Sequence, residues 1–159
     1  GGFFDVKFRH LKSHEDILVF SKGGVATGSA QPCKYNPQGV VNIAPKKRGK
    51  KGLSSTVRTE TAGKGEQTQS NYPKSVLRFD SDFKSEHPTQ KPVALFEYLI
   101  RTYTNEGDTV LDNCAGSGTT AIAAENAKRR WICIERDEGY ATKAVARIRK
   151  HVGEVDIFG

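Results

Sequence analysis

The sequence predicts an α/β fold in which parallel strands alternate with helices. Two features of residues 87–159 support this prediction: short apolar runs alternate with segments of helical periodicity, and a glycine-containing loop follows the first run. Consecutive strands joined through a helix pair in parallel, with the helices packed on the faces of the sheet. We therefore expect a three-layer arrangement that is incomplete on its N-terminal side, with a sheet edge left exposed because few strands are available.

The first helix of this region is expected directly after Pro92, a residue that suits the first helical turn because it lacks an N–H. An apolar stripe at spacings of three and four residues follows, and Gly107 is expected to end the helix. The stripe consists of Val93, Phe96, Leu99, Ile100 and Tyr103.

The remaining elements follow in short succession. Residues 109–112 predict a buried strand, and 119–127 predict a helix of small residues. Residues 131–135 predict a second buried strand, and 138–151 predict a last helix. The resulting order is helix, strand, glycine loop, helix, strand, helix.

Residues 1–86 carry weaker patterns. Residues 3–8 and 17–20 are apolar runs of strand length, and two further strand-like pieces lie at 40–43 and 75–79. Between Gly23 and Phe83 the chain is otherwise rich in Gly, Ser, Thr, Gln and Lys. A long irregular segment of this kind is uncommon in a compact domain unless it is functional or disordered.

The positive charge of the chain is concentrated in its middle third. The formal net charge is +7, and residues 23–86 hold eleven basic against five acidic residues, whereas 87–159 hold ten of each. A neutral body with a basic insertion favours a polyanionic partner for the insertion. A solvated basic loop without a partner is the alternative.

Composition excludes several classes of protein. The mean hydropathy is −0.57 and no apolar run approaches the length of a membrane span. The first residues lack the features of a secretory signal. Three cysteines without a CxxC pair argue against a disulfide framework and a zinc ribbon, so we expect a cytoplasmic protein without a metal. The sequence contains no Met, which suggests a processed or excerpted chain.

The motif that carries chemistry is Asp112-Asn113-Cys114-Ala115-Gly116-Ser117-Gly118-Thr119-Thr120. Glycines after a strand and before a helix let the backbone approach a ligand closely. Glu135 lies 19 residues after Gly116, where a Rossmann-like fold places a carboxylate on ribose hydroxyls. A third glycine and a P-loop lysine are both lacking, which favours a nucleoside ligand without a pyrophosphate. A plain strand-to-helix turn is the alternative.

Three motifs together resemble the C-terminal half of S-adenosylmethionine-dependent DNA amino-methyltransferases. They are His87-Pro88-Thr89-Gln90-Lys91-Pro92, then Gly107-Asp108-x-Val110-Leu111-Asp112, then Gly116-Ser117-Gly118-Thr119-Thr120. Their order is similar to the circularly permuted β class, and His14 to Lys22 resembles the strand that precedes the target-recognition insertion of that class.

The resemblance implies a partial Rossmann-like methyltransferase fold with three parts. Residues 1–22 would form the end of the strands on the catalytic side, residues 23–86 would form an irregular basic target-recognition insertion, and residues 87–159 would bind the cofactor. The glycine loop would lie beneath the methionine part of S-adenosylmethionine, Glu135 would accept hydrogen bonds from the ribose, and the helix after Lys91 could hold the carboxylate. The implied cofactor-binding residues are Thr89, Gln90, Lys91, Asp112, Asn113, Gly116, Gly118, Thr119 and Glu135.

The alternatives for single residues are structural. Lys91 could be a solvent-facing cation, and Cys114 and Cys133 are expected to be small buried thiols without a catalytic task. His10, His14, Glu15 and Asp16 could imitate an acid–base cluster, but amine methylation depends more on placement than on a strong base.

The sequence departs from the family in one respect. The catalytic tetrapeptide, Asp/Asn/Ser-Pro-Pro-aromatic, does not occur, and the chain has no Pro-Pro pair at all. That motif would hold the target amine and stack on a flipped base. We therefore expect no catalytic residue in this chain, which would be inactive alone and would need a missing N-terminal segment or a second chain.

The function expected from the resemblance is methyl transfer to N6 of adenine, which we prefer, or N4 of cytosine, in double-stranded DNA. A non-catalytic nucleic-acid-binding remnant is the alternative. A small-molecule or RNA methyltransferase would explain the glycine loop but not the His87–Pro92 segment or the basic insertion. Five cations within six residues suit contacts to phosphates, which position a protein without reading sequence; they are Lys46, Lys47, Arg48, Lys50 and Lys51.

Overall fold

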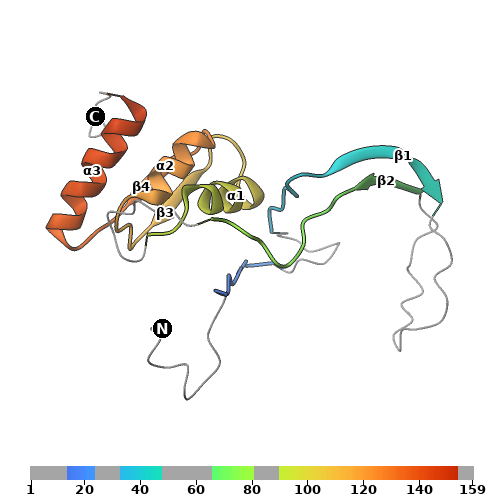
Figure 1. Cartoon of the computed structure of the whole chain (residues 1–159), viewed down its shortest axis with the longest axis horizontal. Coiled ribbons are helices and arrows are strands. Elements are labelled where there is room, and N and C mark those ends of the chain that lie inside the picture. The colour runs from blue at the N-terminus through green and yellow to red at the C-terminus, as the bar shows by residue number, and fades with distance from the viewer. Residues whose placement is uncertain (1–13, 24–32, 48–65, 81–89, 154–159) are drawn as a thin grey trace, which may run out of the picture. The chain divides into compact units, whose positions relative to one another are not determined.

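The computed structural model describes residues 14–23, 33–47, 66–80 and 90–153 (Figure 1). The chain divides into two compact units, Gly1–Cys33 and Lys34–Gly159. In the first unit, residues 14–23 form neither helix nor strand, so the strand predicted at 17–20 is wrong. Its apolar side chains, from Ile17 to Phe20, are exposed. A strand needs a hydrogen-bonded partner, and the described residues of this unit offer none; the run at 3–8 lies outside them.

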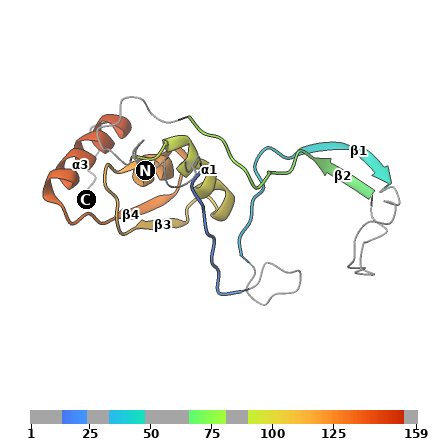
Figure 2. The ribbon, with the colours of Figure 1, turned by 60° about the horizontal axis from the view of Figure 1, so that its bottom comes forward.

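The second unit contains the predicted α/β core. Its two strands, β3 (Thr109–Asp112) and β4 (Arg130–Cys133), pair in parallel with Thr109 opposite Arg130 and Asp112 opposite Cys133. The helix α2 (Thr119–Asn126), labelled in Figure 1, connects them, and Figure 2 shows the two strands side by side. The adjacency of the two strands, on which the α/β prediction depended, is confirmed.

Two further helices of this unit, α1 (Val93–Tyr103) and α3 (Glu138–Val152), precede β3 and follow β4 in sequence. Both lie close to their predicted ranges. The helix α1 ends before Gly107 because the chain becomes extended at Thr104, and Gly107 instead forms a turn with φ of 82°. Asp137 caps the start of α3, since its carboxylate accepts the N–H of Tyr140 at 2.9 Å.

The helices cover one face of the β3–β4 sheet. Val110, Trp131 and Cys133 are half-buried and pack against α1, α2 or α3, whereas Leu111 and Ile132, on the opposite face, are 63% and 54% exposed. The part of the chain that the structure describes therefore has two layers rather than the expected three. There, no other strand pairs with β3 or β4, so their outer edges are open.

Small side chains let α2 pack closely between its neighbours. Four alanines of this segment are fully buried, and Ile100 of α1 and Ile148 of α3 pack against them or beside them. Close packing of this kind leaves little room for added atoms. The alanines are Ala121, Ala123, Ala124 and Ala127.

The segment expected to be an irregular insertion contains an antiparallel hairpin. Strand β1 (Val41–Lys47) pairs with β2 (Glu66–Ser70), with Val41 opposite Ser70 and an irregularity between Asn42 and Lys46. Residues 41–43 of the strand-like piece predicted at 40–43 thus belong to a longer strand, whereas 75–79 forms no strand and the prediction there is wrong. Backbone pairing with β1 defines β2, whose side chains are all polar.

Candidate functional site: the ends of β3 and β4

The candidate site is built where the carboxyl ends of the two parallel strands meet. The backbone continues the pairing past the strands, because Ile134 donates its N–H to the carbonyl of Asp112 at 2.8 Å and Ala115 donates to the carbonyl of Ile134 at 3.0 Å. The loop from Asn113 to Gly118 is thereby held beside the segment that follows β4. In open α/β sheets, this edge is where ligands bind.

Two glycines shape the loop, and they do so differently. Both have positive φ, 53° at Gly116 and 74° at Gly118, a region that other residues avoid. A Cβ atom on Gly118 would lie 3.0 Å from Cδ1 of Ile148 and 3.3 Å from Cβ of Ala144, whereas a Cβ atom on Gly116 would meet nothing within 4 Å. Gly118 therefore serves close packing on α3, and Gly116 leaves open space.

Two carboxylates hold the loop in place. Oδ1 of Asp112 accepts the N–H of Cys114 at 3.0 Å, and Oδ2 accepts the hydroxyl of Thr120. Oε2 of Glu135 accepts the N–H of Gly116 at 2.8 Å, and Oε1 accepts the N–H of Asp137 at 2.9 Å. Glu135 lies two residues beyond the end of β4 rather than inside it. The structure thus brings Glu135 and Gly116 together, as their spacing in the sequence predicted.

A cation that the sequence analysis missed also holds this loop. Nη1 of Arg147, on α3, donates to the carbonyl of Ser117 at 3.0 Å, to its hydroxyl at 3.2 Å and to Oγ1 of Thr119 at 3.0 Å. Thr119 is buried and also donates to the carbonyl of Lys91 at 3.5 Å. The loop is therefore connected to the segments before α1 and within α3. No local pattern signals a contact between residues 28 or 30 positions apart.

The segment before α1 contributes a buried polar atom. Gln90 and Lys91 are half-buried. The side-chain oxygen Oε1 of Gln90 is buried and has no hydrogen-bond partner among the described residues. A buried polar atom without a partner is costly, so it indicates either a missing donor or a ligand. Thr89 lies outside the described residues, and Asn113 is exposed.

The predicted DNA-contacting residues are described only in part. Lys46 is exposed on β1, and Lys47 ends that strand. Arg48, Lys50 and Lys51 lie outside the described residues, so their expected phosphate contacts stay a prediction.

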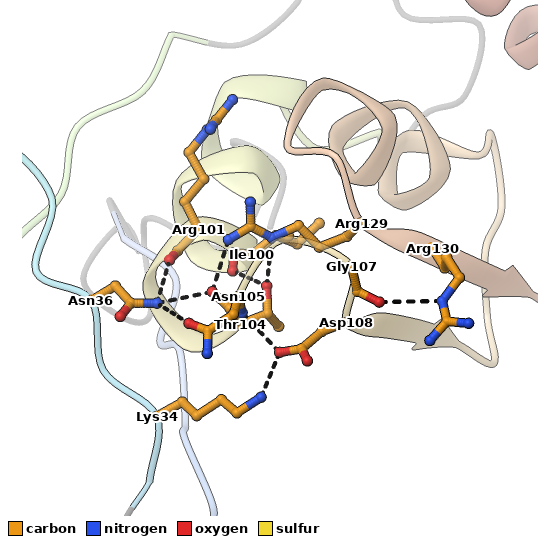
Figure 3. A network of polar contacts seen from close by, with 10 residues as sticks. All are labelled: Lys34, Asn36, Ile100, Arg101, Thr104, Asn105, Gly107, Asp108, Arg129 and Arg130. Atoms are coloured by element: carbon orange, nitrogen blue, oxygen red, sulfur yellow. Dashed lines mark hydrogen bonds and ion pairs between the residues drawn. The ribbon is translucent and has the colours of Figure 1, made fainter.

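A second polar network joins the segment before β1 to the C-terminal end of α1 (Figure 3). We call residues 101–108 the α1 corner. Asn36 donates its backbone N–H to the carbonyl of Thr102 at 2.7 Å, and its side chain donates to the carbonyl of Thr104 at 2.9 Å. Nζ of Lys34 lies 2.6 Å from Oδ2 of Asp108. The hydrogen bond from Lys34, followed by that from the N–H of Asn105, lowers the pKa of Asp108 below its ordinary value.

The thiol at the end of β4 is chemically quiet. Burial, and secondly the negative charge of Asp112, raise the pKa of Cys133 to about 11. Cys133 is half-buried, which meets the expectation of a buried thiol only in part, whereas Cys114 is exposed and the expectation is wrong there. Cys114 follows Asp112 and Asn113 in the loop, outside the packing of α2.

The described residues contain no group of three or more His, Cys, Asp or Glu side chains that could hold a metal ion. His14 and Asp16 lie 3.8 Å apart and are both largely exposed, with His10 outside the described residues. Among the described helices, none has the length and apolar character required to cross a membrane.

A family model described as DNA methylase matches residues 3–146. The chain belongs to the DNA methylase family. The match extends over both the hairpin and the α/β core, including the loop held by Asp112 and Glu135. The family resemblance inferred from the three sequence motifs is confirmed.

Curated members of the DNA methylase family match the chain over about half its length. The Type II methyltransferase M2.DpnII of Streptococcus pneumoniae is 37% identical over 84 residues, which are 53% of this chain and 31% of that protein. M2.LlaDCHI of Lactococcus lactis subsp. cremoris is 34% identical over 86 residues, 54% of this chain and 32% of that protein. The match thus covers about a third of the length of these relatives.

Solved structures of DNA methyltransferases are also similar. The M1.HpyAVI–SAM complex is 39% identical, with 49% of this chain and 37% of that chain covered and a TM-score of 0.41. A putative DNA modification methylase from Thermus thermophilus, complexed with S-adenosyl-L-methionine, is 26% identical, with 74% and 56% covered and a TM-score of 0.40.

Proposed function

We propose that this member of the DNA methylase family binds S-adenosylmethionine at the loop between β3 and α2. The contact between Glu135 and the N–H of Gly116, 2.8 Å long, carries the proposal because it sets an acid beside a glycine turn at the ends of two parallel strands. That arrangement suits a ribose whose hydroxyls donate to the acid. Each carboxylate oxygen can accept more than one hydrogen bond, so Glu135 can hold the loop and the ribose together.

The methionine end of the cofactor would lie over Gly116, where a side chain would find open space. Its ammonium group would supply the donor that Oε1 of Gln90 lacks. Its carboxylate would lie near the start of α1, where the helix dipole favours negative charge. The proposed cofactor-binding residues remain Thr89, Gln90, Lys91, Asp112, Asn113, Gly116, Gly118, Thr119 and Glu135.

The proposed activity is methylation of an exocyclic amine in DNA, N6 of adenine by preference or N4 of cytosine. When bound, S-adenosylmethionine supplies the methyl group. The residues of this chain would bind and orient the cofactor, and the basic segment would hold the DNA backbone. The sequence contains no Pro-Pro pair, so the groups that hold the target amine would come from a further segment or a second chain, and this chain alone would be inactive.

Titration calorimetry of this chain with S-adenosylmethionine tests the cofactor site. Glu135→Ala removes the ribose acceptor and the partner of Gly116, which should cost about 1–3 kcal/mol of binding free energy, or roughly 5–150-fold in affinity. Glu135→Gln, which keeps one oxygen for Gly116, should lose less. Glu106→Ala, at an exposed turn residue, is the matched control. Equal affinities in the parent and Glu135→Ala would contradict the assignment.

The DNA contact is tested through its salt dependence. Each phosphate neutralised by a lysine or arginine contributes about −0.9 to the slope of log affinity against log salt. Replacing Lys46, Lys47, Arg48, Lys50 and Lys51 by Ser should flatten the slope for a DNA duplex and leave S-adenosylmethionine binding unchanged. An unchanged slope would favour the solvated loop without a partner.

A non-catalytic nucleic-acid-binding role is the second candidate, favoured by the missing Pro-Pro pair. A methyl-transfer assay on duplex DNA, with the natural neighbouring coding sequence included, separates the two. Transfer to adenine or cytosine supports the enzyme. DNA binding without transfer supports the remnant.

A further inference from the structure

We propose that Lys34 and Asn36 are positioning residues that fix the basic hairpin on the cofactor-binding core through the α1 corner. The functional consequence of this inference rests on the proposed function. In that proposal, Lys46 and Lys47 of the hairpin contact DNA and the glycine loop of the core binds the cofactor. Its structural content rests only on contacts within the second compact unit.

Asn36 supplies the hydrogen bonds that the end of a helix lacks. The last carbonyls of an α-helix have no partner inside the helix. The backbone N–H of Asn36 donates to the carbonyl of Thr102. Its side-chain amide donates to the carbonyls of Thr104 at 2.9 Å and Arg101 at 3.3 Å and to Oδ1 of Asn105 at 3.1 Å (Figure 3). A residue more than 60 positions away thus caps α1, and such a cap restrains the segment that provides it.

Lys34 adds a charged contact to the same corner. Its ammonium group lies 2.6 Å from Asp108, whose carboxylate also accepts the N–H of Asn105 at 2.8 Å. Asp108 is the residue immediately before β3, and its carbonyl accepts the N–H of Arg130 at 2.9 Å. The lysine is therefore connected through one residue to both strands of the parallel sheet.

The corner is rigidly supported from the core side. Arg129 is 7% exposed, and its guanidinium donates to Oγ1 of Thr104 at 3.0 Å and to the carbonyl of Thr104 at 2.8 Å. Nε of Arg130 donates to the carbonyl of Gly107 at 3.2 Å. Thr104 thus accepts hydrogen bonds from Asn36 on one side and Arg129 on the other, as Figure 3 shows.

The hairpin joins the core through two legs, residues 34–40 before β1 and 71–80 after β2. The second leg reaches the same helix as the first. Phe79, after β2, packs edge-on against Tyr98 of α1 with ring centroids 5.9 Å apart. Tyr35, before β1, lies 6.2 Å from the ring of Tyr103. Both legs are therefore attached to α1, but among the described residues only the first leg has directional hydrogen bonds and a charged pair with the core. Directional contacts fix an orientation, whereas ring contacts tolerate sliding, so Lys34 and Asn36 would set the direction of the hairpin.

The experiment measures the distance between hairpin and core with spin labels at Thr68→Cys on β2 and Lys150→Cys on α3, after Cys33, Cys114 and Cys133 are replaced by Ser or Ala. The parent should give one narrow distance distribution. Lys34→Met combined with Asn36→Ala should broaden it about twofold or more, because the segment loses its local contacts. Lys34→Arg, which keeps the charge, should retain the narrow distribution.

Controls separate positioning from general loss of stability. Glu97→Ala removes the ion pair with Arg101 on α1 without touching either leg and should leave the distribution narrow. The fluorescence of the single tryptophan, Trp131 of β4, reports whether the core is folded in each variant. If Asn36→Ala unfolds the core, the Lys34→Met variant alone tests the proposal, and its distance distribution should be broader than that of the parent.

A distribution as narrow in the Lys34 and Asn36 variants as in the parent would overturn the proposal. The measurement needs neither cofactor nor DNA, so it can fail while the proposed methylation stands. If the protein binds DNA, the slope of log affinity against log salt should not change in these variants. The cations proposed to contact phosphates lie on the hairpin, and the variants change only the orientation of the hairpin.

Discussion

The same substitution to alanine should have different effects at the two glycines of the loop between β3 and α2: Gly118→Ala should cost more stability, and Gly116→Ala should cost more affinity for S-adenosylmethionine. Gly118→Ala places a Cβ atom 3.0 Å from Cδ1 of Ile148 and 3.3 Å from Cβ of Ala144 at a φ of 74°. Ile148 is 3% exposed and cannot turn away freely. The left-handed backbone costs an alanine about 1–2 kcal/mol, and overpacking adds about 1–3 kcal/mol, so we expect a loss of about 2–5 kcal/mol in stability.

Gly116→Ala carries the backbone cost without the crowding, because its Cβ atom would meet nothing within 4 Å. Its stability loss should be about 1–2 kcal/mol. Its loss of S-adenosylmethionine affinity should be tenfold or more, about 1.4 kcal/mol, because the added methyl group would occupy the space proposed for the cofactor. Gly107→Ala is the control, with φ of 82°, equal open space and a position before β3, away from the loop.

Urea denaturation followed by the fluorescence of Trp131 gives the three stabilities, and calorimetry gives the three affinities. Equal stability losses at Gly116 and Gly118 would refute the crowding at α3. Equal affinities in Gly116→Ala and Gly107→Ala would refute the placement of the cofactor over Gly116.

Three further outcomes are expected. Arg147→Ala should lower the free energy of unfolding by about 1–3 kcal/mol, measured with urea, because it leaves loop acceptors without their donor. Cys133, with a pKa of about 11, should be about one-thousandth thiolate at pH 8, so its alkylation by iodoacetamide should be slow at pH 8 and accelerate towards pH 11. The pKa of Asp108 is lowered below the ordinary value of 3.8, so the contact of Asp108 with Lys34 stabilises the fold above pH 3.8, and this stabilisation is lost as the pH falls below that value. Lys34→Met should therefore reduce the loss of stability that unfolding measurements detect between pH 5 and pH 3.

The core elements were predictable because local patterns define them. The stripe from Val93 to Tyr103 identified α1, and the run 109–112 matched the range of β3, although the expected burial of that strand is wrong at Leu111. Backbone pairing defines β2, from Glu66 to Ser70, and its polar side chains give no signal. The reverse error occurred at 17–20, where an apolar run forms no strand because strand formation depends on a partner.

The candidate site was predictable in its motif but not in its supports. The spacing of Gly116 and Glu135 indicated that the two lie together, and a hydrogen bond joins them. The contacts of Arg147 and Asn36 were missed because each joins residues that lie about 30 to 70 positions apart. Such contacts arise from the packing of α3 and α1, which no single motif encodes.

A nitrogen–proton NMR titration of this chain with S-adenosylmethionine tests the central claim most directly. The backbone amides of Gly116 and Asp137, whose N–H groups meet the carboxylate of Glu135, should shift in a saturable manner, with those of Ser117. The amides of β2, Glu66 to Ser70, should not move. Saturable shifts confined to the hairpin, or no shifts at the loop at millimolar cofactor, would contradict a cofactor site at the ends of β3 and β4.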